Sequence, residues 1–232
     1  MKKPLIIFDI DRTIYDGTVG EDFILSLCNH NLIDSKILTL LGLELLEYQT
    51  SISNYQTAVK NVLTLLDKEL KGIEKSKIEK EANNFLKSNH YKFYDYIYEI
   101  SKIFGTRYDF LLLSLEPDFL VKEIAKSLSI KNFIGNEFLG KKTFSGDSKI
   151  LTSKKELFEN SIFSKNEVLA YFGDSENDIE MIEKAHMKFV INPTPKLIEY
   201  MKSNSEIQLI TEKTAYQIFS KTLFQRENKR SF

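Results

Sequence analysis

Three short apolar runs in this chain each end at side chains that carry oxygen, and they constrain the fold more than any other feature. The runs and the residues that follow them are Leu5–Phe8 before Asp9 and Asp11, 108–113 before Ser114, and 168–172 before Gly173 and Asp174. The second run is apolar from residue 110 on, because residue 109 is an aspartate. Largely apolar runs of this length are typical of parallel strands that are covered on both faces. Burying a carboxylate is costly unless a cation, a metal ion or hydrogen bonds compensate it. The aspartates therefore indicate a functional site.

Helical patterns lie between the apolar runs, near residues 118–127, 154–162 and 179–184, and a further strand-like run covers 188–191. Alternating strands and helices predict an α/β fold with a doubly wound, Rossmann-like parallel sheet and helices on both faces. Ligands of such sheets bind beyond the carboxyl ends of the strands, near the point where the strand order reverses. We therefore expect the oxygen-bearing residues to share one edge of the sheet.

A long helical stretch separates the first apolar run from the second. From about residue 21 to residue 88, apolar residues recur at spacings of three and four positions, which is the period of an amphipathic helix. We interpret residues 15–88 as an inserted helical cap domain. Residues 1–14 and 89–232 would then form the α/β core.

Composition excludes several classes of function. The formal net charge of -1 over 232 residues gives no general attraction to nucleic acid or to an anionic membrane. No apolar stretch is long enough to cross a bilayer. The single cysteine, Cys28, excludes an internal disulfide and fits a reducing compartment. These features predict a cytoplasmic protein that binds neither nucleic acid nor a membrane, and they leave the oligomeric state open.

Each motif also has an ordinary structural explanation when it is taken alone. The Asp-x-Asp-x-Thr motif at residues 9–13 could be a turn or a helix cap. It does not open an EF-hand, because Ile14 stands where that loop needs glycine. Ser114 could be an ordinary strand-end hydroxyl, and Lys154 a solvated lysine. Occurring together after successive strands, with GDSENDIEM at residues 173–181, the motifs favour an oxygen-ligand site that suits Mg²⁺.

In this order, the motifs resemble those of the haloacid dehalogenase superfamily, and more narrowly of its subfamily IB, the phosphoserine-phosphatase-like branch. The resemblance covers nearly the whole chain. Residues 9–13, Ser114, a lysine in TSKKELF and GDSENDIEM match the four motifs of the family. Lys154 fits the third motif better than Lys155 by its spacing to the following apolar residues, although the sequence leaves the choice open. A β-hairpin that turns near residues 140–142 is also expected.

The resemblance implies a phosphatase mechanism. Asp9 would attack phosphorus and form an aspartyl-phosphate, and Asp11 would protonate the leaving group and then activate water. Asp9, the main-chain carbonyl of Asp11, and Asp174 would hold Mg²⁺. The remaining residues implied by the family are Thr13, Ser114 and Lys154, which would bind the phosphoryl group, and Asp178, which would orient waters or the lysine.

The substrate and the acceptor stay open at the level of sequence. Asp11 favours phosphoryl transfer over dehalogenation, because a halide leaves without a proton. Phosphoserine-specific members carry two glycines after the serine of motif two, whereas Leu115-Glu116-Pro117 follows Ser114. No arginine occurs between Arg12 and Arg107 to bind a substrate carboxylate. We expect a small phosphorylated metabolite with a neutral or partly apolar leaving group. A strict phosphoserine phosphatase, a phosphotransferase or mutase, and a non-catalytic binding protein on the same fold are the alternatives.

Overall fold

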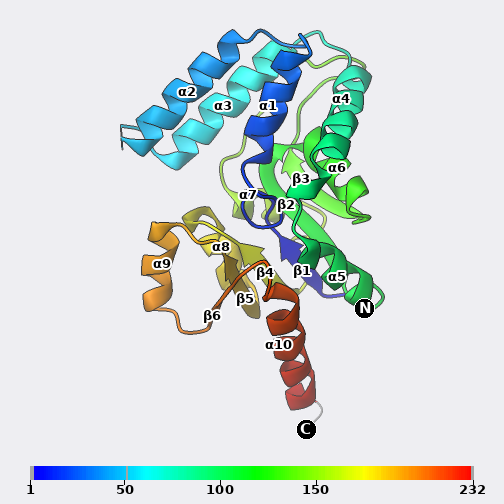
Figure 1. The fold of residues 1–232 in the computed structure, drawn as a ribbon, viewed down its shortest axis with the longest axis vertical. Helices are drawn as coiled ribbons and strands as arrows, with labels where there is room; N and C mark the ends of the chain where they lie inside the picture. Colours follow the sequence, from blue (N-terminus) through cyan, green and yellow to red (C-terminus); the bar gives the residue numbers. More distant parts are fainter. Residues whose placement is uncertain (1–2, 51, 231–232) are drawn as a thin grey trace.

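The computed structural model describes residues 3–50 and 52–230 (Figure 1). Within them, six strands form one sheet in the order β3-β2-β1-β4-β5-β6, and every neighbouring pair is parallel. The strands are β1 (Leu5–Phe8), β2 (Asp109–Pro117), β3 (Asn132–Asn136), β4 (Val168–Gly173), β5 (Met187–Ile191) and β6 (Ile207–Ile210). The predicted α/β fold with a doubly wound parallel sheet is confirmed.

The strand order reverses at β1. From β1 the chain builds outward through β2 to β3, and it then returns to place β4 on the other side of β1. Leu5 consequently lies opposite Asp109 on one side and Val168 on the other. The helical connections leave from both sides of this point, so a crevice opens beyond the carboxyl ends of β1 and β4.

Helices cover both faces of the sheet. One face packs against α5 (Asp95–Phe104), α6 (Asp118–Ser127) and α10 (Ala215–Arg230), and the other against α7 (Lys154–Glu159), α8 (Ile179–Lys184) and α9 (Pro195–Lys202). Short 3₁₀ turns cover His90–Lys92 and Glu176–Asp178. No helix in the described part of the chain combines the length and the apolar character that crossing a membrane requires.

Strand β1 shows why two helical layers are needed. Ile6 and Phe8 contribute to the core cluster on one face, whereas Leu5 and Ile7 contribute to the cluster on the other, and all four are fully buried. Successive side chains of a strand point to opposite faces, so an apolar run without a polar residue has to be covered twice. The uninterrupted apolar sequence of β1 thus requires a helical layer on each face of the sheet.

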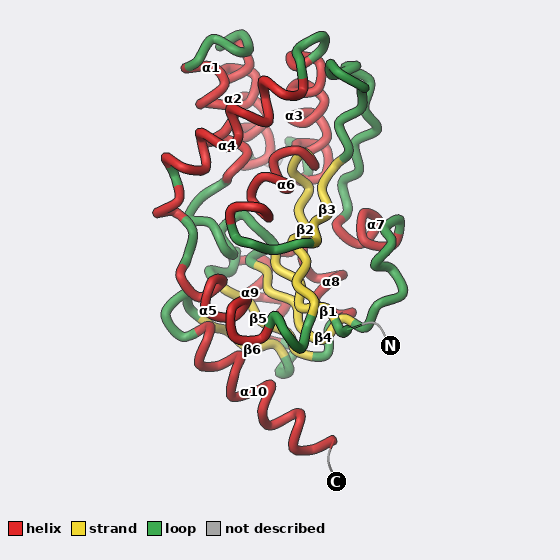
Figure 2. Tube along the Cα trace, turned by 90° about the vertical axis from the view of Figure 1, so that its right-hand side faces the viewer, coloured by secondary structure: helices red, strands yellow, loops and turns green. Residues whose placement is uncertain are grey.

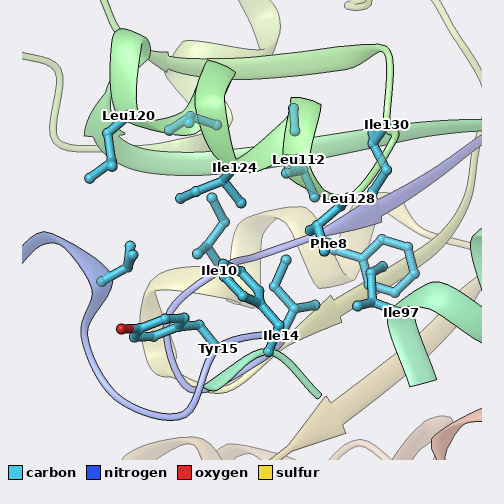
Figure 3. Close-up of a cluster of buried hydrophobic side chains, with 14 of the residues drawn as sticks. Phe8, Ile10, Ile14, Tyr15, Ile97, Leu112, Leu120, Ile124, Leu128 and Ile130 are labelled. Atoms are coloured by element: carbon cyan, nitrogen blue, oxygen red, sulfur yellow. The ribbon is translucent and has the colours of Figure 1, made fainter. Parts of the chain in front are cut away.

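The apolar residues beside the first aspartates fix the loop that carries them (Figure 3). Phe8, Ile10 and Ile14 are fully buried in one cluster with Ile97 of α5 and Ile124 of α6. Ile10 and Ile14 enclose a short loop in which three consecutive backbone N–H groups, of residues 13, 14 and 15, donate to the carbonyl of Ile10. The polar residues of this loop therefore keep a fixed position at the sheet edge.

Among the described residues between β1 and α5, four helices stand beyond the carboxyl edge of the sheet (Figures 1 and 2). They are α1 (Val19–Asn29), α2 (Lys36–Gln49), α3 (Tyr55–Leu70) and α4 (Lys75–Ser88). Helices α2 and α3 pack together as a hairpin, whereas α4 packs against α6 of the core. These helices fill the range expected for the cap, and the division into a cap at 15–88 and a core at 1–14 and 89–232 stays a prediction.

The hairpin expected near residues 140–142 is wrong. The chain does turn there, with Gly140 at φ 131° and the Ser145 N–H donating to the carbonyl of Leu139 at 3.0 Å. The bridge partners, however, are Lys71 and Glu74 in the connection between α3 and α4. The segment turns toward the cap because Phe144 packs into the core cluster instead of lying on an exposed hairpin.

Strands β3 and β6 are absent from the sequence-based expectations. Both lie at the edges of the sheet and lack a continuous apolar run; Leu209 of β6, for example, is 59% exposed. Strand β2 also continues past the expected end at residue 113 to Pro117, with its pairing to β3 interrupted after Leu113. A Cβ at position 135 of β3 would lie 2.7 Å from the carbonyl oxygen of Glu116, so glycine permits this close approach.

Candidate active site

The predicted site residues converge where the strand order reverses. A cavity of about 310 Å³ lies there, between the strand ends and helices α1, α2 and α3. From the side of the sheet it is lined by Asp9, Asp11, Ser114, Lys154 and Asp174. These five residues come from β2, from the segments that follow β1 and β4, and from the start of α7, so the fold brings them together.

Asp9, directly after β1, is held from two sides. Lys154 Nζ donates to its Oδ1 at 2.5 Å, and Thr13 Oγ1 donates to its Oδ2 at 3.1 Å. Burial raises the pKa of Asp9 to about 6, while Lys154 opposes this effect and Asp178 adds to it. At neutral pH Asp9 is therefore mostly ionised, as an anionic nucleophile or metal ligand has to be.

Asp178 anchors the lysine. Its Oδ1 accepts hydrogen bonds from Lys154 Nζ and the Tyr171 hydroxyl, each at 2.6 Å. Its Oδ2 accepts from the backbone N–H of Asp174 at 3.1 Å and from the N–H and Oγ of Ser175 at 3.0 and 3.2 Å. Burial alone would raise the pKa of Asp178, but Lys154 and the Tyr171 hydroxyl lower it on balance. A carboxylate offers about four acceptor positions, so these five donors saturate it.

The glycine of the GDSEND motif makes room for this carboxylate. A Cβ at position 173 would lie 2.6 Å from Cγ of Asp178. No side chain fits between the end of β4 and the following turn while Asp178 occupies its place. The spacing Gly-Asp-x-x-x-Asp thus has a direct packing reason.

Asp11 lies between the start of a helix and another carboxylate. Its Oδ1 accepts a hydrogen bond from the N–H of Val19, the first residue of α1, at 2.6 Å. Burial, followed by the charges of Glu116 and Asp9, raises the pKa of Asp11 well above its usual value, although the bond from Val19 opposes this. Protonated Asp11 is favoured at a pH where a free aspartate would be ionised.

Asp174, after β4, completes a compact acidic group. Burial raises the pKa of Asp174 to about 8, with the charges of Asp178 and Asp9 adding to the shift. Carboxylate oxygens of these three aspartates lie within 4.8 Å of one another. The half-exposed Arg12 brings Nε to 3.4 Å from Asp174 Oδ2. Because Asp178 is saturated with hydrogen bonds, a cation at this place could bind Asp9 and Asp174.

Two predicted phosphate-binding residues occupy different positions. Ser114 lines the cavity, and its Oγ accepts a hydrogen bond from the N–H of Glu116 at 3.1 Å, which leaves the hydroxyl proton available. Thr13 is fully buried and does not line the cavity; its hydroxyl donates to Asp9 instead. A contact between Ser114 and a phosphoryl group stays a prediction, and the geometry of Thr13 fits a role in orienting Asp9.

The two lysines of TSKKELF lie in different environments. Lys154, at the first position of α7, is buried and reaches Asp9. Lys155 points to the surface, with its Nζ 3.3 Å from Glu180. Burial alone would lower the pKa of Lys154, but Asp178 and Asp9 raise it well above its usual value, so this lysine is charged.

Three residues of the site were not predicted from the sequence as functional. Tyr171 donates to Asp178, and Tyr55 and Glu116 line the cavity. A tyrosine within a fully buried strand needs a hydrogen-bond partner for its hydroxyl, so VLAYF did carry a signal for Tyr171. The placement of Tyr55 and Glu116 depends on how the cap packs over the sheet, which local sequence does not encode.

A family model described as haloacid dehalogenase-like hydrolase matches residues 6–183, which span the strand ends described above. The chain belongs to this family. The predicted resemblance is therefore confirmed at the level of the family, and the cavity at the strand ends is where a hydrolase of this fold would hold its substrate.

Solved structures share the fold of this hydrolase at low sequence identity. A protein of unknown function from Bordetella pertussis Tohama I has a TM-score of 0.75 and 14% identity, with 91% of this chain and all of the other covered. A phosphoserine phosphatase with an analogue of its phospho-aspartyl intermediate has a TM-score of 0.58 and 20% identity, with 91% and 94% covered. Cytosolic 5'-nucleotidase IIIB bound to cytidine has a TM-score of 0.62 and 14% identity, with 90% and 80% covered. No curated protein matches the hydrolase significantly by sequence.

Proposed function

We propose that this hydrolase is a Mg²⁺-dependent phosphatase that cleaves a small phosphomonoester through an aspartyl-phosphate on Asp9. The observation that carries the proposal is the Asp9 carboxylate, ionised at neutral pH, at the wall of a cavity that also holds Asp11. The solved phosphoserine phosphatase and 5'-nucleotidase, whose names denote phosphomonoester hydrolysis, support the reaction class on the same fold.

Asp9 would supply the attacking oxygen, and Asp11 would move the proton. Residues two apart on an extended chain point to the same side, so both carboxylates can reach the same substrate. The raised pKa of Asp11, caused by burial and then by Glu116, keeps it protonated for transfer to the departing alcohol. Asp11 would then accept a proton from the water that hydrolyses the aspartyl-phosphate.

Lys154 and Ser114 would hold the phosphoryl oxygens. Lys154 is charged and is held between Asp9 and Asp178 at the cavity wall, so its ammonium lies beside the carboxylate that would attack the phosphoryl group. Ser114 offers its hydroxyl proton from β2, three residues before the strand ends. In this scheme Asp178 positions Lys154, and Thr13 orients the Asp9 carboxylate.

The donor set fits Mg²⁺. Four carboxyl groups, those of Asp9, Asp11, Asp174 and Glu116, line the cavity beside two cations, Lys154 and the half-exposed Arg12. Burial and mutual repulsion raise the pKa of each of these carboxyls, and a bound cation would favour their ionised forms. Hard carboxylate and carbonyl oxygens are the ligands Mg²⁺ prefers, and Asp9, Asp174 and the main-chain carbonyl of Asp11 would hold it. The bound ion would supply positive charge that offsets the repulsion between Asp9 and the phosphoryl group.

An assay that follows both products tests the proposal. The protein is incubated with Mg²⁺ and phosphomonoesters of sugars, hydroxy acids, amino alcohols and nucleosides, and released alcohol and inorganic phosphate are measured in the same reaction. Equal amounts are expected for hydrolysis, and acid-quenched protein should carry one phosphoryl group on the peptide that contains Asp9. Alcohol in excess of phosphate would identify a phosphotransferase. Release of neither product from any ester would contradict the proposal.

A further inference from the structure

Among the residues that the structure describes, the cap end of the cavity carries no free positive charge. Helices α1, α2 and α3 contribute apolar and aromatic residues to this wall, among them Ile24, Leu45, Tyr55 and Val59. Among the described residues that line the cavity, the cations are Arg12 and Lys154, and both lie next to carboxylates at the sheet end. An anionic group on the alcohol side of a substrate would therefore find no counter-ion at the cap.

Glu116 brings an unpaired carboxylate to this end. Within the described part of the chain, its backbone N–H bonds to Ser114, but its side chain makes neither a hydrogen bond nor an ion pair. The carboxylate packs directly over the start of α1, because a Cβ at position 20 would lie 2.3 Å from each of its two oxygens. Glycine at position 20 thus creates the space that the Glu116 carboxylate occupies in the cavity wall.

The other glutamates of the cavity show that this is a particular arrangement. Glu176 also lines the cavity, but its carboxylate accepts hydrogen bonds from Tyr48 and Thr194 and lies 3.4 Å from Lys196. Glu21 lies at the exposed rim, and its charge helps to raise the pKa of Glu116. Glu116 is therefore the partly buried carboxylate of this wall that has no partner of its own among the described residues.

We propose that the cap end of the cavity binds an ammonium group on the alcohol of the phosphomonoester, with Glu116 as its counter-ion. The inference rests on the proposed phosphatase function and deepens it by naming a substrate class. An ammonium group would satisfy a carboxylate that otherwise faces Asp11 and Asp9 without compensation. The tyrosine rings of the wall would lie near the ammonium group, since aromatic faces favour a nearby cation. The methyl groups of the wall would contact the carbon chain of the amino alcohol.

The same charges disfavour a substrate carboxylate. Phosphoserine carries an ammonium group and a carboxylate, and the carboxylate would meet Glu116 or an apolar wall instead of a cation. The sequence alone led us to expect a neutral or partly apolar leaving group. The position of Glu116 over Gly20 changes that expectation to a cationic group, while a phosphomonoester without a carboxylate is still preferred.

Three esters of similar size separate these possibilities in the full-length protein with Mg²⁺. They are 2-aminoethyl phosphate, 2-hydroxyethyl phosphate and O-phosphoserine. We expect kcat/KM for 2-aminoethyl phosphate to exceed that for the hydroxyl analogue at least about thirtyfold, and that for phosphoserine by more. The hydroxyl of 2-hydroxyethyl phosphate can also donate a hydrogen bond to Glu116, so the comparison tests the positive charge of the ammonium group. Equal or better turnover of 2-hydroxyethyl phosphate would overturn the inference.

Two variants remove the proposed contact in different ways. Glu116→Gln removes the charge and keeps the shape, whereas Gly20→Ala keeps the charge and displaces the carboxylate with its Cβ. Both should reduce the ratio of kcat/KM between the amino and hydroxyl esters to within about threefold of unity. The ratio isolates the contact, because an effect of Glu116 on Asp11 would change both esters alike. Glu176→Gln, which alters an already paired carboxylate in the same wall, should leave the ratio unchanged.

The outcomes distinguish this inference from the function on which it rests. Loss of the preference in Glu116→Gln and Gly20→Ala, but not in Glu176→Gln, supports the ammonium site. Hydrolysis of the hydroxyl ester with no preference for the amino ester rejects the ammonium site and keeps the phosphatase. Absence of turnover with any phosphomonoester rejects the phosphatase, and the inference falls with it.

Discussion

Asp178, behind the sheet end of the cavity, accepts five hydrogen bonds, whereas Leu45 and Val59 at the cap end can offer only apolar contact. At the sheet end each buried charge depends on several partners from different elements. At the cap end the apolar side chains of α2 and α3 contribute mainly volume. A substitution at the sheet end therefore leaves a buried charge without compensation, while one at the cap end changes the shape of the space left for the alcohol. Substitutions at the sheet end should therefore abolish the reaction, whereas substitutions at the cap end should alter the substrate preference and leave the reaction possible.

The largest expected effect tests the nucleophile at the sheet end. In Asp9→Asn the amide keeps the shape of the side chain and loses the charge, so turnover should fall by at least about a thousandfold. Phosphate release measures the loss, and far-UV circular dichroism checks that the fold is retained. More than about 1% of wild-type activity would exclude Asp9 as the attacking group.

The next effect compares two adjacent lysines. Lys154→Met leaves Asp9 and Asp178 buried without their shared cation, so the free energy of unfolding should fall by about 3–5 kcal/mol, with loss of activity. Lys155→Met removes only a surface contact to Glu180 and should change stability by less than about 1 kcal/mol. Urea denaturation measures both. Similar losses in the two variants would contradict the assignment of Lys154.

A smaller effect concerns the metal and pH. Burial raises the pKa values of Asp9, Glu116 and Asp174 to about 6, 7 and 8, so the folded state binds more protons than the unfolded chain between about pH 4 and 8. The metal-free protein should therefore lose stability as pH rises through this window. Added Mg²⁺ should raise Tm more at pH 8 than at pH 5.5. For a chain of this size, a stabilisation of one kcal/mol corresponds to an increase in Tm of about 2–4 °C.

Thermal unfolding in chelator, with and without excess Mg²⁺, measures this difference at each pH. Activity should stop in excess chelator and return with Mg²⁺. A Tm that rises with pH in chelator, or a Mg²⁺ effect that is the same at both pH values, would show that these carboxyls do not form the metal site.

The smallest expected effect lies at the cap end. Leu45→Ala shortens a side chain in the wall and so enlarges the cavity. The ratio of kcat/KM between a bulky and a small ester should change about three- to tenfold. The kcat/KM for the small ester should stay nearly constant. Leu43→Ala, on the same helix but 52% exposed, is the matched control and should leave the ratio unchanged. Equal ratios in wild type and Leu45→Ala would mean that α2 does not select the substrate.

The difference between the two ends also explains what the sequence could predict. Asp9, Ser114 and Asp174 follow apolar runs that are buried on both faces, so both their strands and their common edge were predictable. β3 and β6, as edge strands with partial exposure, lack such a run. The environment of Glu116 depends on Gly20 in another element, and no local pattern reports a contact between positions so distant in sequence.

The position of β1 in the middle of the sheet has a consequence for the biosynthesis of this chain. β1 leaves the ribosome first, yet its two partners are residues 109–112 and 168–172. During translation β1 and Asp9 therefore lack their partner strands until β2 and β4 have been synthesised. Pairing strands that lie so far apart in sequence is slow. Only after β4 has emerged can Asp9 and Asp174 meet. A nascent or truncated chain that ends before β4 therefore exposes the apolar residues of β1 and contains Asp9 without Asp174.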